Sequence, residues 1–127
     1  MNGVHFIKGL MINMKTSNFW KIDKNNIDNY VSIAGKCPNW YKGREYKKLA
    51  PKYWFFKKYK LDGDEISYTK DYYKEVLDKL DPQEIYDKLG EDAIILCWEK
   101  PGDFCHRRLV AEWLEKALGI TIDEIGM

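Results

Sequence analysis

AIILCWEKPGDFCHRRLVAEWLEKALG, residues 93–119, joins an apolar run to an amphipathic stretch through a polar turn. The run Ala93–Cys97 contains no polar residue other than its thiol, which is typical of a strand buried on both faces of a parallel sheet. Pro101-Gly102 predicts a turn, and Asp103 is placed to cap a helix. The inward stripe of that helix is Leu109, Val110, Trp113, Leu114 and Ala117. The segment therefore predicts a strand, a turn and a helix in that order.

The chain before this segment alternates between predicted strands and predicted helices. Leu10–Met14, with MKTSN as its exit loop, and Tyr30–Ala34 are predicted strands. Glu45–Tyr59 has helical character interrupted by a proline, and Glu65–Leu80 has apolar residues at helical spacing. Asp81-Pro82 opens a short helix that ends at Gly90. This order predicts an α/β domain with a short, mostly parallel sheet.

The length of 127 residues predicts a single domain over residues 1–127, of which about residues 1–10 form an accessory extension. No apolar run approaches the roughly 20 residues that span a bilayer, and the first residues do not read as a secretory signal, so no membrane partner is expected. Three cysteines are few, and because their number is odd they cannot all pair with one another, so a disulfide framework is not expected. We therefore expect a cytoplasmic protein.

Charge is distributed unevenly although the net charge is only +1. Residues 36–60 carry nine Lys/Arg and one acid, whereas residues 62–92 carry eleven acids and four lysines. Aromatic residues interleave with the cations of the basic stretch, a pattern that suits phosphate contacts and base stacking. The same pattern is typical of a half-buried helix with solvated lysines, and the small net charge argues against non-specific duplex binding.

Ligands in open parallel sheets bind beyond the carboxyl ends of the strands. This rule selects three loops, Lys15–Phe19, Gly35–Gly43 and Trp98–His106. The last loop is the richest in chemistry, and from it we predict Glu99, Cys105 and His106 as candidate catalytic residues. The predicted ligand-binding residues are Lys36, Trp40, Tyr41, Phe104 and Arg107.

Each of these residue types has a chemical reason to be in a site. At a helix N-terminus the pKa of the Cys105 thiol would be lowered, and His106 titrates near neutrality. Arg107 could hold an anion at the same helix end, or could instead pair with Glu99. Tyr41 and its neighbour Trp40 could stack on a base, although a loop anchored in the core by its tryptophan would look the same in the sequence.

Two runs of the sequence resemble the family named domain of unknown function 488. LCWEKPGDFCHRRLVAEWL (residues 96–114) is similar to that family's C-terminal motif, Cys-x-Glu-x5-Cys-His-Arg, and SIAGKCPNWYKGREYKKLAPKYWFFKKYK (residues 32–60) to its N-terminal region. The resemblance implies a small, Rossmann-like, three-layer α/β domain without a settled activity. The residues that match the motif are Cys97, Glu99, Pro101, Cys105, His106 and Arg107.

The leading functional hypothesis is a pocket at the carboxyl edge of the sheet that holds a small anionic ligand of nucleotide or nucleoside type. An enzymatic version would be a hydrolase or a transferase. One alternative is a non-catalytic module that sequesters such a ligand or contacts nucleic acid. Another is a thiol-redox or zinc protein that uses Cys97, Cys105 and His106, although these residues lack the usual zinc spacings. A dinucleotide fingerprint is absent, and neither a cofactor nor a metal is expected.

Overall fold

The computed structural model describes residues 13–126 of the chain. Its strands form one sheet in the order β3-β2-β4-β1-β5, and every neighbouring pair is parallel. The strands are β1 (Lys15–Asn18), β2 (Tyr30–Ser32), β3 (Arg44–Glu45), β4 (Ile94–Cys97) and β5 (Asp123–Glu124). The predicted α/β class with a short parallel sheet is confirmed.

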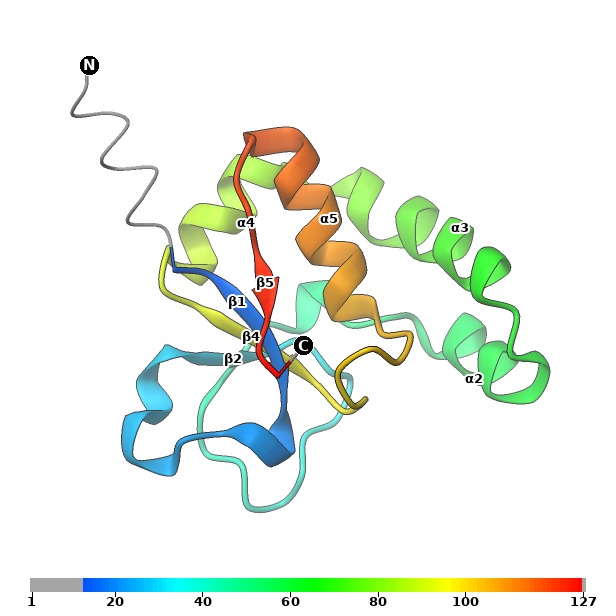
Figure 1. Cartoon of the computed structure of the whole chain (residues 1–127). Coiled ribbons are helices and arrows are strands. Elements are labelled where there is room, and N and C mark those ends of the chain that lie inside the picture. The colour runs from blue at the N-terminus through cyan, green and yellow to red at the C-terminus, as the bar shows by residue number, and fades with distance from the viewer. Residues whose placement is uncertain (1–12, 127) are drawn as a thin grey trace.

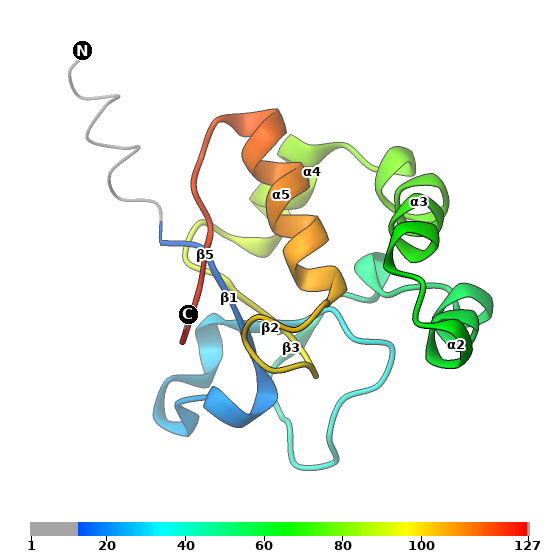
Figure 2. The same ribbon diagram turned by 45° about the vertical axis from the view of Figure 1, so that its right-hand side comes forward.

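Helices cover one face of this sheet, and irregular segments cover the other (Figure 1). The helices are α2 (Tyr53–Asp62), α3 (Glu65–Glu75), α4 (Pro82–Leu89) and α5 (His106–Leu118). Short 3-10 turns between residues 19 and 29 and the loop of residues 35–43 lie on the opposite side, as Figure 2 shows. The result is a small domain of three layers.

Side chains of the central strand enter both layers because neighbouring residues of a strand point to opposite faces. Ile95 is fully buried in the large cluster beneath α3, α4 and α5, together with Val31. Leu96 is fully buried in a smaller cluster on the other face, with Phe19 and Tyr30. Burial on both faces explains why the run of residues 93–97 is apolar throughout.

The ends of α4 follow from local chemistry, as the sequence predicted. The Asp81 carboxylate accepts a hydrogen bond from the Glu84 amide at 2.9 Å, and Pro82 occupies the first turn. Gly90 follows the last helical residue with φ of 99°, a value that side chains rarely tolerate. Gly119 ends α5 in the same way, at φ 69°.

The first strand was predicted in the wrong place. The predicted run Leu10–Met14 lies mostly outside the described residues, and β1 occupies Lys15–Asn18, within the predicted exit loop. Thr16 and Asn18 are polar but buried, and their side chains are bonded: Thr16 donates to Glu124, and Asn18 caps the next turn by accepting from the Trp20 amide. The polar side chains made this strand resemble a loop in the sequence, because the partner of the buried Thr16 lies far along the chain.

The two helices predicted at Glu45–Tyr59 and Glu65–Leu80 are also shorter in the structure. The predicted helix at Glu45–Tyr59 becomes β3, a 3-10 turn at Lys47–Leu49 and then α2, which begins two residues after Pro51. Proline disfavours helical backbone at the residue before it, so the helix starts only beyond the ring. The predicted helix at Glu65–Leu80 ends at Glu75, followed by a 3-10 turn at Leu77–Lys79.

Within residues 13–126, none of the helices combines the length and the apolar character that crossing a bilayer requires.

Candidate functional site

The N-cap of α5 lies two residues beyond the predicted cap, Asp103. Asp103 lies in the turn after β4, where its amide donates to the Lys100 carbonyl at 3.1 Å. Cys105 is the residue at the N-cap, with extended backbone at φ −157° and ψ 145°, and its side chain makes no capping hydrogen bond. His106 is therefore the first helical residue, and Cys105 lies just outside the helix.

A cavity of about 680 Å³ opens at the carboxyl ends of β2 and β4. Two of the three predicted loops contribute to its wall, together with α2, the residue Pro51 before it and Tyr68 of α3. The lining residues are Ala34, Gly35, Lys36, Pro51, Tyr53, Phe56, Tyr59, Lys60, Tyr68, Cys97, Trp98, Glu99, Phe104, Cys105 and His106. Four of the predicted site residues, Lys36, Glu99, Phe104 and His106, thus share one pocket with Cys105.

One wall of this pocket is a cluster of aromatic rings. Phe104 is half-buried, and its ring lies 5.3 Å from the rings of both Tyr59 and Tyr68. Tyr53 and Phe56 extend this wall along α2 and are exposed. Aromatic residues supply large contact areas that suit planar ligands.

Charged groups surround these rings. Lys36 and Lys60 are exposed at the pocket, and the half-buried Glu99 also lines it. Burial raises the pKa of the Tyr68 hydroxyl, and the negative charge of Glu99 raises it further. The indole nitrogen of Trp98 donates to the Lys36 carbonyl at 2.8 Å, which joins the two loops that carry these charges.

His106 is buried and held in one orientation. Its Nε2 lies 2.8 Å from the Ile33 carbonyl oxygen, which can only accept, so Nε2 carries the proton and Nδ1 has a free lone pair. Burial is the main cause that lowers the pKa of His106 to about 4; the positive charge of Arg107 acts in the same direction, and the hydrogen bond to the Ile33 carbonyl opposes it. The imidazole is therefore uncharged near pH 7, whereas the sequence analysis expected it to gain and lose its proton near that pH.

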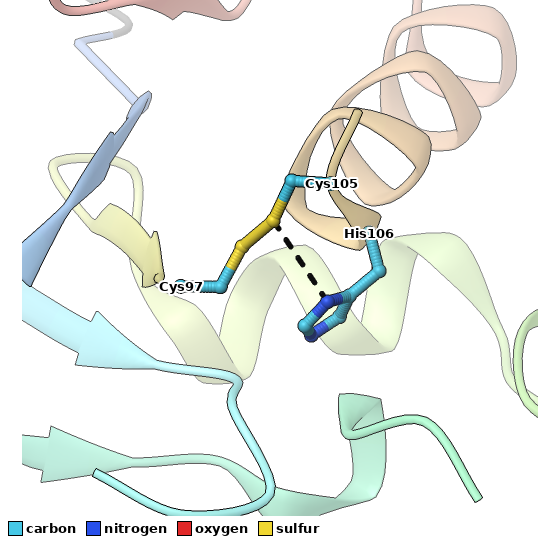
Figure 3. A group of neighbouring side chains, drawn as sticks. All are labelled: Cys97, Cys105 and His106. Carbon is cyan, nitrogen blue, oxygen red and sulfur yellow. Dashed lines mark hydrogen bonds between the residues drawn. A yellow bond between two sulfur atoms is a disulfide. The ribbon is translucent and has the colours of Figure 1, made fainter. Parts of the chain in front are cut away.

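Cys97 and Cys105 are joined by a disulfide beside this imidazole (Figure 3). The Cys105 sulfur lies 4.0 Å from Nδ1 of His106. The sequence argued against a disulfide framework, although a thiol-redox role for Cys97 and Cys105 was one of the alternatives. Because Cys105 has extended rather than helical backbone, the side chains of Cys105 and His106 both reach the same pocket.

Arg107, predicted as an anion clamp, does not reach the pocket. Its side chain is fully buried and forms a bidentate pair with Glu124, with Nη2 to Oε2 at 2.6 Å. Nη1 donates to the Cys97 sulfur at 3.2 Å, and Nη2 also reaches the Lys100 carbonyl at 3.3 Å. Both the predicted clamp and the alternative pairing with Glu99 are therefore wrong.

Tyr41 and Trp40 also lie elsewhere than predicted. Tyr41 is buried, and its hydroxyl donates a hydrogen bond to the Arg44 carbonyl at 2.8 Å. The Tyr30 carbonyl also lies within hydrogen-bond distance of this hydroxyl, at 3.2 Å. Trp40 contacts the rings of Phe19 and Trp20 on the opposite side of the sheet from the α-helices. Tyr41 therefore anchors its loop in the core and does not stack on a pocket ligand.

The pocket includes residues that the sequence did not single out. Lys60 and the rings of Tyr53, Phe56 and Tyr59 come from α2. The only signal for them was the mixture of rings and cations in residues 36–60, which fits an ordinary half-buried helix equally well.

A family model for DUF488-N3a, described as the active DUF488-N3 subclade, matches residues 24–118. This range contains the whole motif from Cys97 to Arg107 and every residue that lines the pocket. No curated protein and no solved structure matches the chain. The chain therefore belongs to the DUF488-N3a family.

Proposed function

We propose that the chain binds a small anionic ligand of nucleotide or nucleoside type in the pocket at the carboxyl edge of the sheet. The observation that carries this proposal is the composition of a single cavity: a wall of aromatic rings, two lysines and one carboxylate. Its volume of about 680 Å³ falls within the roughly 300–1,000 Å³ of small-molecule sites.

The ring wall is the part suited to a base. Phe104 presents its ring at the start of α5, where Tyr59 and Tyr68 pack behind it and hold it in place. Stacking of a base on an aromatic side chain contributes about 1–3 kcal/mol and tolerates different bases. We therefore assign Phe104 to the base and expect limited discrimination among bases.

The lysines are the part suited to a phosphate. Lys36 follows β2 and Lys60 lies on α2, so the two ammonium groups approach the pocket from different elements. The N-terminus of α5 faces the same cavity through Cys105 and His106, and the side chain of its N-cap residue, Cys105, makes no capping hydrogen bond. Helix N-termini favour anions, which supports placing the phosphate near this end.

Glu99 is the group suited to sugar hydroxyls or to proton transfer. It is half-buried and lies close enough to Tyr68 to affect its pKa. In a hydrolase it would be the general base, because it is a half-buried carboxylate that lines the cavity. This enzymatic version predicts that Glu99→Gln removes turnover and leaves binding of the nucleotide largely intact, measured by chromatography of released base and phosphate.

A thermal-shift panel tests the binding proposal. The probes are ribonucleoside monophosphates, the corresponding nucleosides, ribose phosphate, inorganic phosphate and a single-stranded oligonucleotide. We expect the monophosphates to stabilise most among the small-molecule probes, since they alone of these carry both a base for the rings and a phosphate for the lysines. Stabilisation by the oligonucleotide alone would favour nucleic-acid contact instead, and no shift across the panel would contradict the proposal.

Paired variants locate the site within the molecule. Phe104→Leu removes the proposed stacking ring and should reduce the shift given by the monophosphates. Trp54→Leu is the matched control, because Trp54 is also aromatic and 53% exposed but lies outside the pocket lining. Equal losses in both variants would place binding elsewhere.

A further inference from the structure

We propose that Cys97, Cys105 and His106 form a zinc site in the dithiol state of the protein, and that formation of the disulfide abolishes it. The two sulfurs and an imidazole nitrogen lie within 4.8 Å of one another, and all three residues are buried. Two thiolates and one imidazole are a ligand set that zinc favours, with a fourth position left open in catalytic sites.

The geometry of the backbone suits this ligand set. The Cα atoms of Cys97 and Cys105 are 7.3 Å apart, wider than the roughly 4.4–6.8 Å of most disulfides. Two thiolates on one tetrahedral zinc ion, with zinc–sulfur distances near 2.3 Å, lie about 3.8 Å apart. A metal ion between the sulfurs therefore fits residues held at the end of β4 and at the start of α5.

The imidazole is already oriented as a ligand. Its Nε2–H donates to the Ile33 carbonyl at 2.8 Å, which leaves the lone pair of Nδ1 directed toward Cys105 (Figure 3). Histidines that bind metals commonly donate their second nitrogen to a carbonyl or a carboxylate in this way. The contact with Ile33 thus supplies the outer hydrogen bond that a zinc-bound histidine uses.

The Cys97 sulfur also has an outer partner. Nη1 of Arg107 donates to it at 3.2 Å, and Arg107 is itself fixed by Glu124. A guanidinium next to a sulfur favours the thiolate, the form that binds a metal. The buried pair of Arg107 and Glu124, which the proposed nucleotide site does not use, then has a chemical role in addition to its structural one.

The two states interconvert by balanced chemistry. A dithiol reductant donates two electrons and two protons: the bond between Cys97 and Cys105 breaks, two thiols form, and the reductant becomes a disulfide. Zinc then displaces both thiol protons, which are released to solvent, while the neutral His106 binds through Nδ1. The open fourth position faces the cavity, because all three ligands line it.

Zinc binding is measured on the full chain without nucleotide, so the result does not depend on the proposed ligand. After reduction and removal of the reductant, titration against a chromophoric zinc chelator should give one zinc ion per chain. Diamide, which oxidises dithiols, should release that zinc. Cobalt(II) in place of zinc should show the intense visible bands of tetrahedral coordination and a thiolate charge-transfer band.

Serine variants assign the ligands. Cys97→Ser and Cys105→Ser should each weaken zinc binding at least a hundredfold and reduce the thiolate band, since each removes one sulfur. Cys37→Ser is the matched control and should bind zinc like the natural chain, because the Cys37 thiol is directed at the Ser32 hydroxyl instead. Absence of zinc from the reduced chain, or its retention in the double variant Cys97→Ser/Cys105→Ser, would overturn the proposal.

Discussion

Arg107 and Glu124 form an ion pair in the protein interior, with Nη2 of the arginine 2.6 Å from Oε2 of the glutamate. The arginine side chain is fully buried and the glutamate side chain is 5% exposed. Because Arg107 also reaches the Cys97 sulfur, the pair connects α5, β5 and the end of β4. It therefore holds Cys97, which lines the pocket, in place, although neither Arg107 nor Glu124 lines the pocket itself.

Removing the negative charge of this pair should destabilise the fold. Glu124→Gln keeps the shape of the side chain but leaves the buried guanidinium of Arg107 without a counter-charge, which typically costs about 3–5 kcal/mol. Asp123→Asn is the matched control, since Asp123 is exposed and its pair with Lys15 spans 3.8 Å, and such a pair contributes about 0–1 kcal/mol. Urea unfolding of both variants measures the difference. A loss of less than about 1 kcal/mol in Glu124→Gln would contradict this role.

Stability of the disulfide form should fall as the pH falls below about 6.5. The pKa of His106 is lowered to about 4 in the folded protein, so the unfolded chain takes up a proton first and gains free energy from it. The contribution is complete above the unfolded pKa and is lost between about 6.5 and 4, on the order of 3 kcal/mol in total. Urea unfolding at several pH values, with a metal chelator present, gives the slope.

The variant His106→Gln isolates this effect. Glutamine is neutral and can still donate to the Ile33 carbonyl, so the pH dependence between about 6.5 and 4 should shrink in this variant. Glu124 acts mainly at lower pH: burial alone would raise its pKa, but hydrogen bonds from Arg107 and Thr16 outweigh burial and lower it. Its contribution is present above the unfolded pKa and lost as the pH falls through the folded one. Identical slopes for the natural chain and the variant would exclude the buried neutral imidazole.

The loop that carries Tyr41 should be sensitive to one added methyl group. A Cβ at position 43 would lie 2.6 Å from Cζ of the Tyr41 ring, so Gly43→Ala must displace that buried ring at a cost of about 1–3 kcal/mol. Gly35→Ala is the control, because a Cβ there meets no atom of the described residues within 4 Å. Thermal unfolding compares the two, and equal melting temperatures would show that Tyr41 does not anchor the loop.

The sequence was informative where local chemistry decides the structure. The apolar run before Cys97, the cap at Asp81 and the stop at Gly90 each depend on nearby residues, and each lies where it was predicted. β1 was misplaced because its side chains are polar although buried, and the partner of Thr16, Glu124, lies far along the chain. The local pattern of polar and apolar residues carries no information about a partner so far along the chain.

The same distinction applies to the pocket. Glu99 and Phe104 were predicted from the loop rule for parallel sheets, and both line the cavity. Arg107 was misassigned because its counter-charge lies 17 residues further on, in a strand of only two residues. The rings of α2 were not predicted because their position over the sheet edge depends on how α2 and α3 pack.

The most direct test of ligand binding in this pocket is isothermal titration calorimetry with adenosine monophosphate. The double variant Lys36→Ala/Lys60→Ala should weaken binding about tenfold or more, equivalent to about 1.4 kcal/mol. Lys42→Ala/Lys70→Ala, which removes two exposed lysines outside the pocket lining, should leave the Kd unchanged. No heat of binding to the natural chain, or an equal loss of affinity in both double variants, would contradict a nucleotide site at this edge of the sheet.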